Sequence, residues 1–319
     1  MQDIKIGCKK KIKVLMAIYA QYRSYGGPYQ VVTELSKNLN IKQFETKIIF
    51  KKNDITSFNV NFKELIKYYD IVHLFGLWQP WINLVACSAK KQKKKIIWNT
   101  LGALETWSLN QKKLKKKIAL TIYQKKILEY ANLVQCTSQQ EKEDFEKLKI
   151  NVESIIVPHS VNLSDDNNLL NRTKKFNQVL FYSRIHPKKG LEIIINLWRG
   201  ILEKLKKNLV LNIYGPVSDE SYYKFLLKKT KELNLEKNII FYDPVYDIDQ
   251  KNKIFLNHDF FILTSYSENF GISIAEALSY GLPVLTSNKT PWEIIDKNNA
   301  GIVCEINEKY NKCYLRDVQ

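Results

Sequence analysis

Short apolar runs of strand length alternate with segments of helical periodicity along the chain, and this alternation limits the possible folds more than any other feature. In the first half it predicts strands at Ile12–Ile18, Thr46–Phe50, Ile71–Phe75, Lys95–Thr100, Leu133–Cys136 and Ser154–Val157. The predicted helices are one opened by Pro28, Phe62–Tyr68, Trp81–Lys90, a long basic helix from about Asn110 to Tyr130, and one that runs from a Ser138–Glu141 capping box to Leu148. Such an alternation indicates a parallel, doubly wound α/β sheet, which binds ligands beyond the carboxyl ends of its strands.

A second alternation follows a polar segment, Pro158–Lys175, that lacks this periodicity. Its strands are predicted at Val179–Tyr182, Leu209–Tyr214, Ile239–Tyr242, Phe260–Thr264 and Pro283–Thr286. Its helices are predicted at Gly190–Lys206, Tyr222–Leu233, Asp249–Leu256 and Ile272–Tyr280. The sequence therefore predicts two doubly wound domains, residues 1–160 and 176–319, joined by a linker at 161–175 and facing each other across a cleft.

With 319 residues, of which 45% are hydrophobic, the chain can bury the cores of two such domains. It has no apolar stretch long enough to span a membrane and no signal-peptide pattern, because MQDIKIGCKKK leads directly into a strand. The five cysteines are scattered without a CxxC pair, which argues for reduced thiols and against a zinc site. We therefore expect a cytoplasmic protein.

Positive charge is concentrated in the first half of the chain. Residues 1–160 carry 28 Lys+Arg against 13 Asp+Glu, a net charge of +15, whereas residues 161–319 carry 22 against 19, a net charge of +3. Much of the excess lies in two lysine clusters, Lys91–Lys95 and Lys112–Lys117. Such clusters attract acidic partners, and we expect an anionic membrane surface, so that the protein is peripheral on the inner face of the plasma membrane. A lysine-rich solvated surface is the alternative; nucleic acid is not expected, because no nucleic-acid-binding module accompanies the charge.

Two carboxylates flank a predicted strand-to-helix turn in the stretch Phe260–Gly281, FFILTSYSENFGISIAEALSYG. Glu268 falls in the loop and Glu276 about one turn into the helix, which Gly281 ends. The helix start between them offers unpaired N–H groups and the positive end of a dipole, which suits a phosphate, and the carboxylates can accept hydrogen bonds from sugar hydroxyls. Taken alone, the two glutamates are better explained as a solvated helix residue and a loop residue.

Other candidate residues lie at similar positions. Arg184 and Lys189 occupy the loop SRIHPKKG after the first strand of the second domain, where two cations can neutralise a diphosphate. In the first domain, Gly26 and Gly27 allow backbone N–H groups to approach a phosphate, although a plain tight turn explains them equally well. His73 and the segment 100–102 are expected at two strand ends.

The motifs SRIHPKKG, IYGP, YSENFGISIAEALSYGLPVLTS and TPWEI occur in this order, and together they resemble the retaining glycosyltransferases of family 4, which have the GT-B fold. The stretches GGP, VHLFGLW and ALETWSLNQKKLKKKIA are similar to members that build bacterial polysaccharides and lipopolysaccharide. The resemblance runs from about residue 12 to about residue 303.

This resemblance implies a role for each matching residue. Arg184 and Lys189 would bind the donor diphosphate, and Glu276 would hold the ribose hydroxyls. Glu268 would contact the transferred sugar. The remaining donor-binding matches are Asn269, Phe270 and Gly271 in the sugar pocket, Gly26 and Gly27 facing the phosphates, and Gly215 and Pro216 near the base. The fold would need no metal ion or cofactor, and Asp247-Ile248-Asp249 is expected to open a helix.

The chain departs from the family's pattern at three places, one of which is VPHSVN in the linker, where relatives commonly have Pro-Asn-Gly. Many members carry a histidine after the strand at Lys95–Thr100, where this chain has Leu101-Gly102, so His73 is the nearest catalytic candidate in the first domain. After Cys304 the family continues with further helices, whereas this chain stops at EINEKYNKCYLRDVQ, so we expect a shortened C-terminal end.

The resulting hypothesis is a retaining hexosyltransferase that moves a sugar from a nucleoside-diphosphate sugar to a lipid-linked glycan acceptor in cell-surface polysaccharide biosynthesis. Two alternatives remain at this point. One is a GT-B sugar-nucleotide epimerase, which would consume the donor without an acceptor. The other is a non-catalytic or inactive truncated GT-B protein.

Overall fold

The structure is a computed structural model that describes residues 10–19, 27–39, 41–50, 61–161, 177–206 and 208–306. The chain divides into two compact units, Met1–Ser160 and Val161–Gln319, and each is described here by itself. Three features expected from the sequence lie outside the described residues: Gly26, the linker apart from Val161, and the C-terminal end after residue 306.

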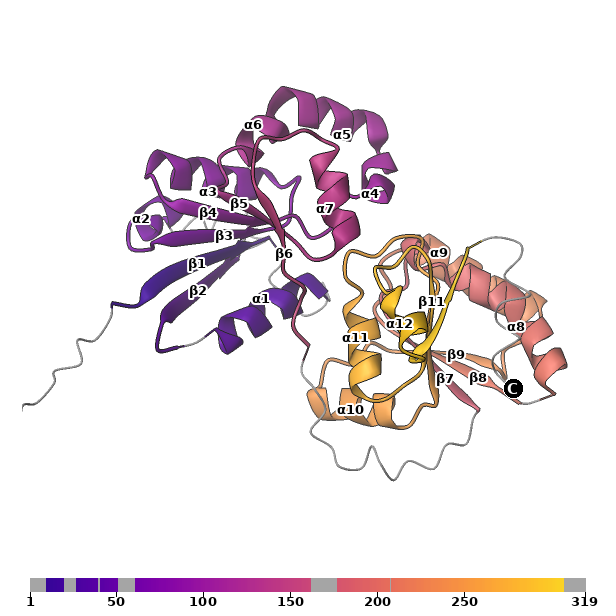
Figure 1. The fold of residues 1–319 in the computed structure, drawn as a ribbon. Helices are drawn as coiled ribbons and strands as arrows, with labels where there is room; N and C mark the ends of the chain where they lie inside the picture. Colours follow the sequence, from indigo (N-terminus) through magenta and orange to yellow (C-terminus); the bar gives the residue numbers. More distant parts are fainter. Residues whose placement is uncertain are drawn as a thin grey trace, which may run out of the picture. The chain divides into compact units, whose positions relative to one another are not determined.

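A six-stranded parallel sheet forms the centre of the first unit, with helices on both faces (Figure 1). Its strands are β1 (Ile12–Ile18), β2 (Phe44–Phe50), β3 (Ile71–Phe75), β4 (Lys95–Asn99), β5 (Leu133–Cys136) and β6 (Ser154–Ile156). They are ordered β2-β1-β3-β4-β5-β6. The strand order reverses between β1 and β3, and every pair of neighbours is parallel, as the alternation of strands and helices predicted.

The helices of the first unit are α1 (Gly27–Asn38), α2 (Phe62–Ile66), α3 (Pro80–Lys91), α4 (Thr106–Asn110), α5 (Lys113–Ala119), the π-helical turn η2 (Leu120–Gln124), α6 (Lys125–Leu128) and α7 (Gln139–Glu146). The largest buried cluster of this unit joins one face of the sheet to α3 and contains Trp98, Ile82 and Val85. Burial of such side chains is the main stabilising term, at about 1.5–3 kcal/mol for each large residue.

The expected single helix from Asn110 to Tyr130 is wrong in its first part. The chain forms the separate short helix α4, breaks at Gln111 and Lys112, and only then enters a helix that continues through α5, η2 and α6. Lys112 has a left-handed backbone with φ 54°, which ends the helical path of α4. No glycine or proline marks this break, so the periodicity alone ran through it.

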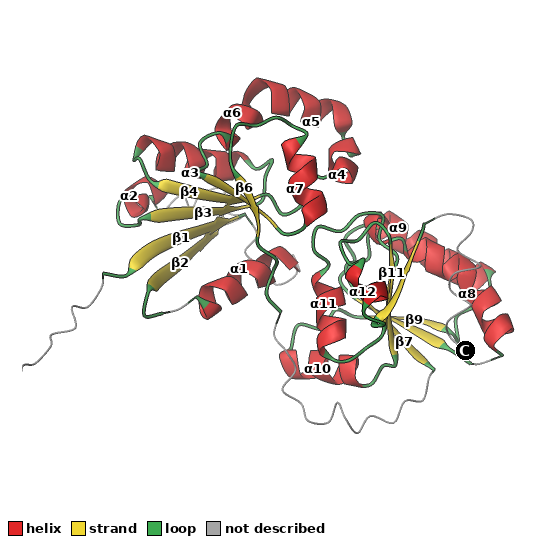
Figure 2. Ribbon diagram, in the orientation of Figure 1, coloured by secondary structure: helices red, strands yellow, loops and turns green. Residues whose placement is uncertain are grey.

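The second unit also contains a six-stranded parallel sheet between helices (Figure 2). Its strands are β7 (Gln178–Tyr182), β8 (Val210–Tyr214), β9 (Ile239–Tyr242), β10 (Phe260–Leu263), β11 (Val284–Ser287) and β12 (Gly301–Cys304). Their order is β12-β11-β10-β7-β8-β9. Two successive doubly wound parallel sheets confirm the predicted fold class.

The helical elements of the second unit are the 3₁₀ turn η4 (Pro187–Lys189), α8 (Leu191–Leu205), α9 (Glu220–Glu232), α10 (Ile248–Leu256), α11 (Ile272–Ser279) and α12 (Ile294–Lys297). Sequence periodicity predicted neither α12 nor β12. Helix α12 spans only about one helical turn, which is too short to show a helical repeat. Asp247 is the N-cap of α10, since its side chain accepts a hydrogen bond from the Gln250 N–H at 2.9 Å, and this confirms its expected capping role.

Candidate functional site

The order of strands in the second unit identifies one edge of its sheet as the place for a ligand. β7 and β10 are neighbours, and from this pair the chain builds outward in opposite directions, to β8 and β9 on one side and to β11 and β12 on the other. At such a switch point the loops that leave the two strands diverge and open a crevice at the carboxyl end of the sheet. The loop after β7 carries Lys189, and the loop after β10 carries Glu268.

Lys189 is the last residue of η4, and its backbone is held on both sides. His186 caps the turn, because its Nδ1 accepts a hydrogen bond from the Lys188 N–H at 3.1 Å. Gly190 follows with φ 63°, and a Cβ at this position would lie 2.3 Å from the carbonyl oxygen of Thr264. The Thr264 hydroxyl in turn donates to the carbonyl of Gly190 at 2.9 Å. Only glycine permits this approach, so the lysine is presented beside the end of β10.

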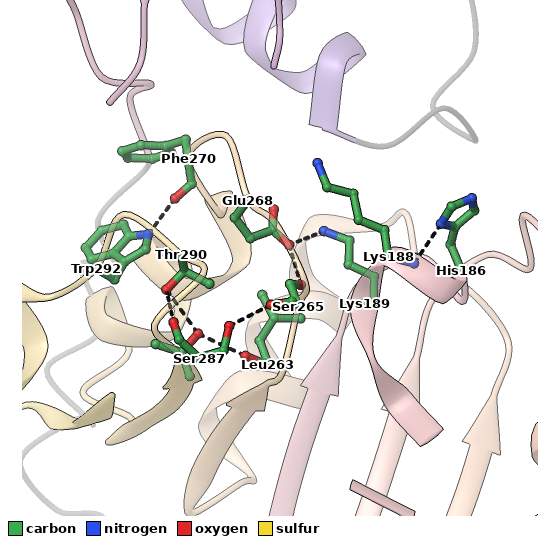
Figure 3. Close-up of polar contacts among 11 residues, drawn as sticks. His186, Lys188, Lys189, Leu263, Ser265, Glu268, Phe270, Ser287, Thr290 and Trp292 are labelled. Atoms are coloured by element: carbon green, nitrogen blue, oxygen red, sulfur yellow. Dashed lines mark hydrogen bonds and ion pairs between the residues drawn. The ribbon is translucent and has the colours of Figure 1, made fainter. Parts of the chain in front are cut away.

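Glu268 forms an ion pair with Lys189, and both side chains are about nine-tenths buried, at 9% and 10% exposed. The carboxylate oxygen that meets Lys189 also accepts a hydrogen bond from the Ser265 hydroxyl at 2.6 Å. Figure 3 shows the lysine and serine side chains converging on this carboxylate. Lys189 and Glu268 are 79 positions apart in the sequence, so their ion pair depends on the adjacency of β7 and β10.

Electrostatics keep the carboxylate ionised. Burial by itself would raise the pKa of Glu268, but the charges of Lys189 and Lys188, with the hydrogen bonds from Lys189 and Ser265, outweigh it and lower the pKa below the ordinary value. For Lys189, burial is the largest influence and lowers the pKa, aided by the nearby cation Arg184, while Glu268 acts in the opposite direction. The site thus holds a carboxylate and a cation that little water screens.

The loop that carries Glu268 is tied to the neighbouring loop after β11. The Ser287 hydroxyl donates to the Ser265 carbonyl at 2.6 Å, and the Glu268 N–H donates to the Lys289 carbonyl at 3.1 Å. Further along, the Trp292 indole N–H donates to the carbonyl of Phe270, and the two rings lie 5.4 Å apart (Figure 3). These contacts hold the site residues in place without a ligand, as a preorganised binding site requires.

Glu276 lies in the second turn of α11 and is 7% exposed. Its carboxylate accepts a hydrogen bond from the Lys251 amino group of α10 at 2.5 Å. The same amino group lies 5.5 Å from the centre of the Tyr182 ring, at the end of β7. The two glutamates of the sequence motif therefore form ion pairs with two different lysines, Glu268 with Lys189 and Glu276 with Lys251.

The start of α11 has the geometry that the sequence predicted. Gly271 is its N-cap with φ 78°, and no side chain caps the helix, so the N–H groups of its first turn are not bonded by a capping side chain. A Cβ on Gly271 would lie 3.1 Å from Ile274 and 3.2 Å from the Trp292 indole nitrogen. Asn269 and Phe270, the other residues expected in the sugar pocket, precede it in the loop and are half-buried.

Arg184 lies two residues after β7 and is exposed, and within the described part of the chain it makes no ion pair. Gly215 and Pro216 lie beside it. The Ile185 N–H donates to the Pro216 carbonyl at 2.9 Å, and a Cβ on Gly215, where φ is 154°, would lie 1.9 Å from the Ser183 carbonyl oxygen. The loops after β7 and β8 thus pack backbone against backbone, which requires glycine at this position and places Arg184 near Lys189 at the same edge of the sheet.

Three candidates that the structure describes belong to the first unit: His73, Gly27 and residues 100–102. His73 lies in the middle of β3, two residues before the strand ends, so its expected position at the strand end is wrong. Its ring is buried, and its Nε2 has no hydrogen-bond partner among the residues that the structure describes. Burial lowers the pKa of the imidazole to about 3, although a hydrogen bond with Gln135 acts in the opposite direction. Gly27 is the first residue of α1, whereas residues 100–102 do follow β4 directly, as expected.

Sequence reasoning missed Lys251 and Ser265 at this site. Ser265 lies within the quoted motif, three residues before Glu268, but serine is common in loops and carried no signal of its own. Lys251 lies 25 residues before Glu276, on a helix that the periodicity did predict. Its ion pair with Glu276 joins α10 to α11, and local sequence patterns do not indicate that these two helices are in contact.

Solved structures of known proteins share this fold. The two parallel six-stranded sheets match solved GT-B glycosyltransferase structures. Sucrose-phosphate synthase from Thermosynechococcus elongatus superposes with a TM-score of 0.69 at 16% identity, covering 89% of this chain and 83% of that one. The Anabaena protein Alr3699/HepE in complex with UDP and glucose gives a TM-score of 0.67 at 17% identity, covering 88% and 82%.

The family model of the glycosyl transferases group 1 matches residues 164–312. This match lies within the second unit and confirms, for residues 164–312, the family that the motifs predicted. A probable sucrose-phosphate synthase of Thermosipho melanesiensis is 24% identical over 249 residues, which cover 73% of this chain and 56% of the relative. The chain thus spans about half the length of this curated relative, and 41% and 30% of two others.

Proposed function

We propose that the protein transfers a sugar from a nucleoside-diphosphate sugar to a hydroxyl of a glycan acceptor, with retention of the anomeric configuration. The observation that carries this proposal is the buried Lys189–Glu268 pair at the switch point of the second unit, the unit that matches the group 1 family model. The Anabaena structure was obtained with UDP and glucose bound, so a UDP-sugar is the first donor to test.

The cations are proposed to bind the diphosphate. An ammonium group has three N–H donors, so Lys189 can keep its bond to Glu268 and also donate to a phosphate oxygen. Arg184 is exposed at the same edge, and its planar fork can bind a second phosphate oxygen. As the bond to the sugar breaks, negative charge accumulates on the diphosphate. Cations held beside it then stabilise the transition state, and each typically contributes a few kcal/mol to lowering the barrier.

The carboxylates are proposed to hold the neutral parts of the donor. Glu268 is ionised and already bonded to Lys189 and Ser265, and it would accept hydrogen bonds from the transferred sugar, with Asn269, Phe270 and Gly271 lining that pocket. Glu276 would hold the ribose hydroxyls, with its carboxylate oriented by Lys251. The uncapped start of α11 would add N–H donors for the phosphates. Gly215 and Pro216 would lie near the base.

Two measurements test this proposal. The first is the rate at which UDP is released from UDP-glucose, and the second is the affinity for UDP, measured by titration calorimetry. Arg184→Ala should weaken UDP binding by about tenfold or more, because it removes a cation assigned to the diphosphate. The variant should fold normally, since the Arg184 side chain is exposed. Arg199→Ala is the matched control, since Arg199 is equally an exposed arginine of the same unit but belongs to the middle of α8. Equal UDP affinity for the wild type and Arg184→Ala would refute the assigned role.

The same assay examines the buried pair. Glu268→Gln should slow sugar transfer while leaving UDP affinity nearly unchanged, because Glu268 is assigned to the sugar and not to the diphosphate. Glu232→Gln is its control, as Glu232 is in an exposed ion pair with Lys228 in the same unit. A UDP-sugar that is converted without any acceptor would indicate an epimerase, and absence of nucleotide binding across UDP, GDP and their sugars would indicate a non-catalytic protein.

The acceptor is proposed to be a lipid-linked glycan used in building a cell-surface polysaccharide. The support is the strongly basic first unit, which is assigned to the acceptor, while the second unit is assigned to the nucleotide sugar. Thin-layer analysis of products formed from UDP-sugars with a membrane lipid extract tests this assignment. Transfer to water-soluble oligosaccharides alone would contradict it.

A further inference from the structure

One helix of the first unit has a buried side and an exposed side of unusual composition. α5, η2 and α6 form one continuous helical segment, residues 113–128, at the periphery of this unit (Figure 1). Its inner side is packed, because Leu120 and Leu128 are buried and Gln124 forms two hydrogen bonds of 3.1 Å with Asn83 of α3. These contacts fix which side of the helix faces solvent.

The outer side presents a row of large apolar side chains. Leu114, Ile118 and Ile122 follow one another at intervals of four residues, so they lie on one stripe of the helix. They are 72%, 49% and 66% exposed. Single exposed apolar residues are normal on a protein surface, but a row of three with helical spacing marks an interaction surface.

Lysines border this row on both sides. Lys113, Lys115 and Lys117 are exposed, and none of them forms an ion pair with any residue in the part of the chain that the structure describes. From Thr106 to Leu128 the sequence has no aspartate or glutamate that could neutralise them. Lys116 differs, because it turns inward and donates to the Ser108 carbonyl. The outer side of the helix is therefore an apolar row within a field of uncompensated positive charge.

We propose that this surface, the outer side of residues 113–122, binds an anionic phospholipid bilayer, with the helix lying in the plane of the interface. The three apolar side chains would enter the boundary between headgroups and acyl chains, and the lysines would remain at the level of the phosphates. A bilayer offers both features that this surface needs, an apolar layer and a dense anionic layer directly above it. A nucleic acid offers the charge but no apolar layer, since its phosphates face outward.

The other lysine cluster of the sequence lacks this combination. Lys91–Lys95 spans the end of α3 and the start of β4, where the flanking Ala89 and Ile96 are buried. Within this cluster Lys94 donates to the Lys67 carbonyl at 2.8 Å. The proposal therefore assigns bilayer binding to the α5 surface alone, although the two clusters look equivalent in the sequence.

The structure adds one related fact: among the described residues, no helix is both long and apolar enough to cross a bilayer. The proposed contact is peripheral and does not depend on the glycosyl-transfer reaction, so it can be tested without donor or acceptor. Vesicles of phosphatidylcholine with about 30% phosphatidylglycerol provide the anionic surface, and pure phosphatidylcholine vesicles provide the neutral one. The purified protein is sedimented with each, and the bound fraction gives a partition coefficient.

A first pair of variants separates the effect of the apolar row from nonspecific binding by exposed apolar side chains. Leu114→Ser/Ile122→Ser removes the two most exposed members of the row and should reduce partitioning onto anionic vesicles by at least about tenfold. Ile41→Ser/Tyr68→Ser is the control, because these residues of the same unit are 73% and 70% exposed but lie outside the surface of residues 113–122, and partitioning should stay within about twofold. An equal loss in both variants, or none in the first, would overturn the proposal.

A second pair separates local charge from net charge. Lys113→Gln/Lys115→Gln/Lys117→Gln and Lys91→Gln/Lys93→Gln/Lys95→Gln each remove three exposed positive charges. The first should weaken partitioning by at least about tenfold and the second by about twofold or less. Equal effects, equal binding to neutral vesicles, or no binding of the wild type would overturn the proposal. If the first triple variant lost affinity for a short DNA duplex but not for vesicles, the surface would belong to nucleic acid and the proposal would fail.

All of these substitutions replace exposed side chains, so the melting temperature of each variant should remain within a few degrees of the wild type. Circular dichroism before sedimentation confirms that each variant is folded. A failed sugar-transfer assay with normal vesicle binding would count against the proposed function alone, and the reverse result would count against the membrane surface alone.

Discussion

The Lys189–Glu268 ion pair offers the sharpest test of how the second unit is held together. Glu268→Gln keeps the size of the side chain and its ability to accept a hydrogen bond from Ser265, but it removes the negative charge. Lys189 then remains about nine-tenths buried without its counter-charge. The physical question is how much free energy the folded state loses when this buried cation is left unpaired.

The expected loss follows from the burial of both partners. Breaking a buried ion pair by removing one partner costs about 3–5 kcal/mol, because the remaining charge cannot be rehydrated, whereas an exposed pair contributes about 0–1 kcal/mol. For a folding unit of this size, 1 kcal/mol corresponds to about 2–4 °C in melting temperature. Glu268→Gln should therefore lower the melting temperature of the second unit by at least about 6 °C.

The assay is thermal unfolding followed by circular dichroism, with Glu232→Gln as the exposed control. A third variant, Lys189→Met/Glu268→Gln, removes both charges and should be more stable than Glu268→Gln, because no unpaired charge remains in the interior. A Glu268→Gln melting temperature within about 2 °C of the control would refute the reasoning, as would a double variant no more stable than the single one.

Three further predictions concern the same unit. The folded-state pKa of Glu268 is lowered, so the stabilisation from its carboxylate is present above the ordinary value of 4.5 and is lost as the pH falls through the folded-state pKa. In urea unfolding, the difference in free energy of unfolding between the wild type and Glu268→Gln should therefore shrink below about pH 4.5. Gly190→Ala should lower the free energy of unfolding by at least about 1–3 kcal/mol in the same urea measurement, since a Cβ there would lie 2.3 Å from the Thr264 carbonyl oxygen. Gly200→Ala in α8 is the control and should be neutral or stabilising, because open space surrounds that position. Similar effects of the two substitutions would contradict the packing described. Lys251→Met should raise the KM for the UDP-sugar by about tenfold with little change in kcat, because Lys251 orients Glu276, which is assigned to the ribose. An unchanged KM would show that Lys251 has no such positioning role.

Much of the fold could be predicted from the sequence because strand and helix periodicity are local properties. The run Ile12–Ile18 forms β1 with the predicted bounds, and the strand before Glu268 and the helix containing Glu276 were placed within one residue of β10 and α11. Features of about one helical turn or less could not be predicted in this way. The break at Gln111 and Lys112 is such a feature, and so is the four-residue helix α12.

The site was only partly accessible from the sequence. Loops after strands could be located, and so Lys189, Glu268 and Arg184 could be named as candidates from their charge and position. The pairing of Lys189 with Glu268, and of Lys251 with Glu276, could not be predicted from local patterns, because each pair joins elements whose adjacency depends on strand order and helix packing. His73 shows the opposite limit, since β3 has the predicted bounds, Ile71–Phe75, but the histidine lies at its buried centre and not at its end.

The amino-acid sequence by itself determined the alternation of strands and helices, the two parallel sheets that follow from it, and the excess of positive charge in the first half. Only the tertiary structure decided which lysine meets which carboxylate, and which of two similar lysine clusters borders exposed apolar side chains. The physical reason is that periodicity and charge are properties of neighbours in the chain, whereas ion pairing and exposure depend on which distant segments pack together and exclude water.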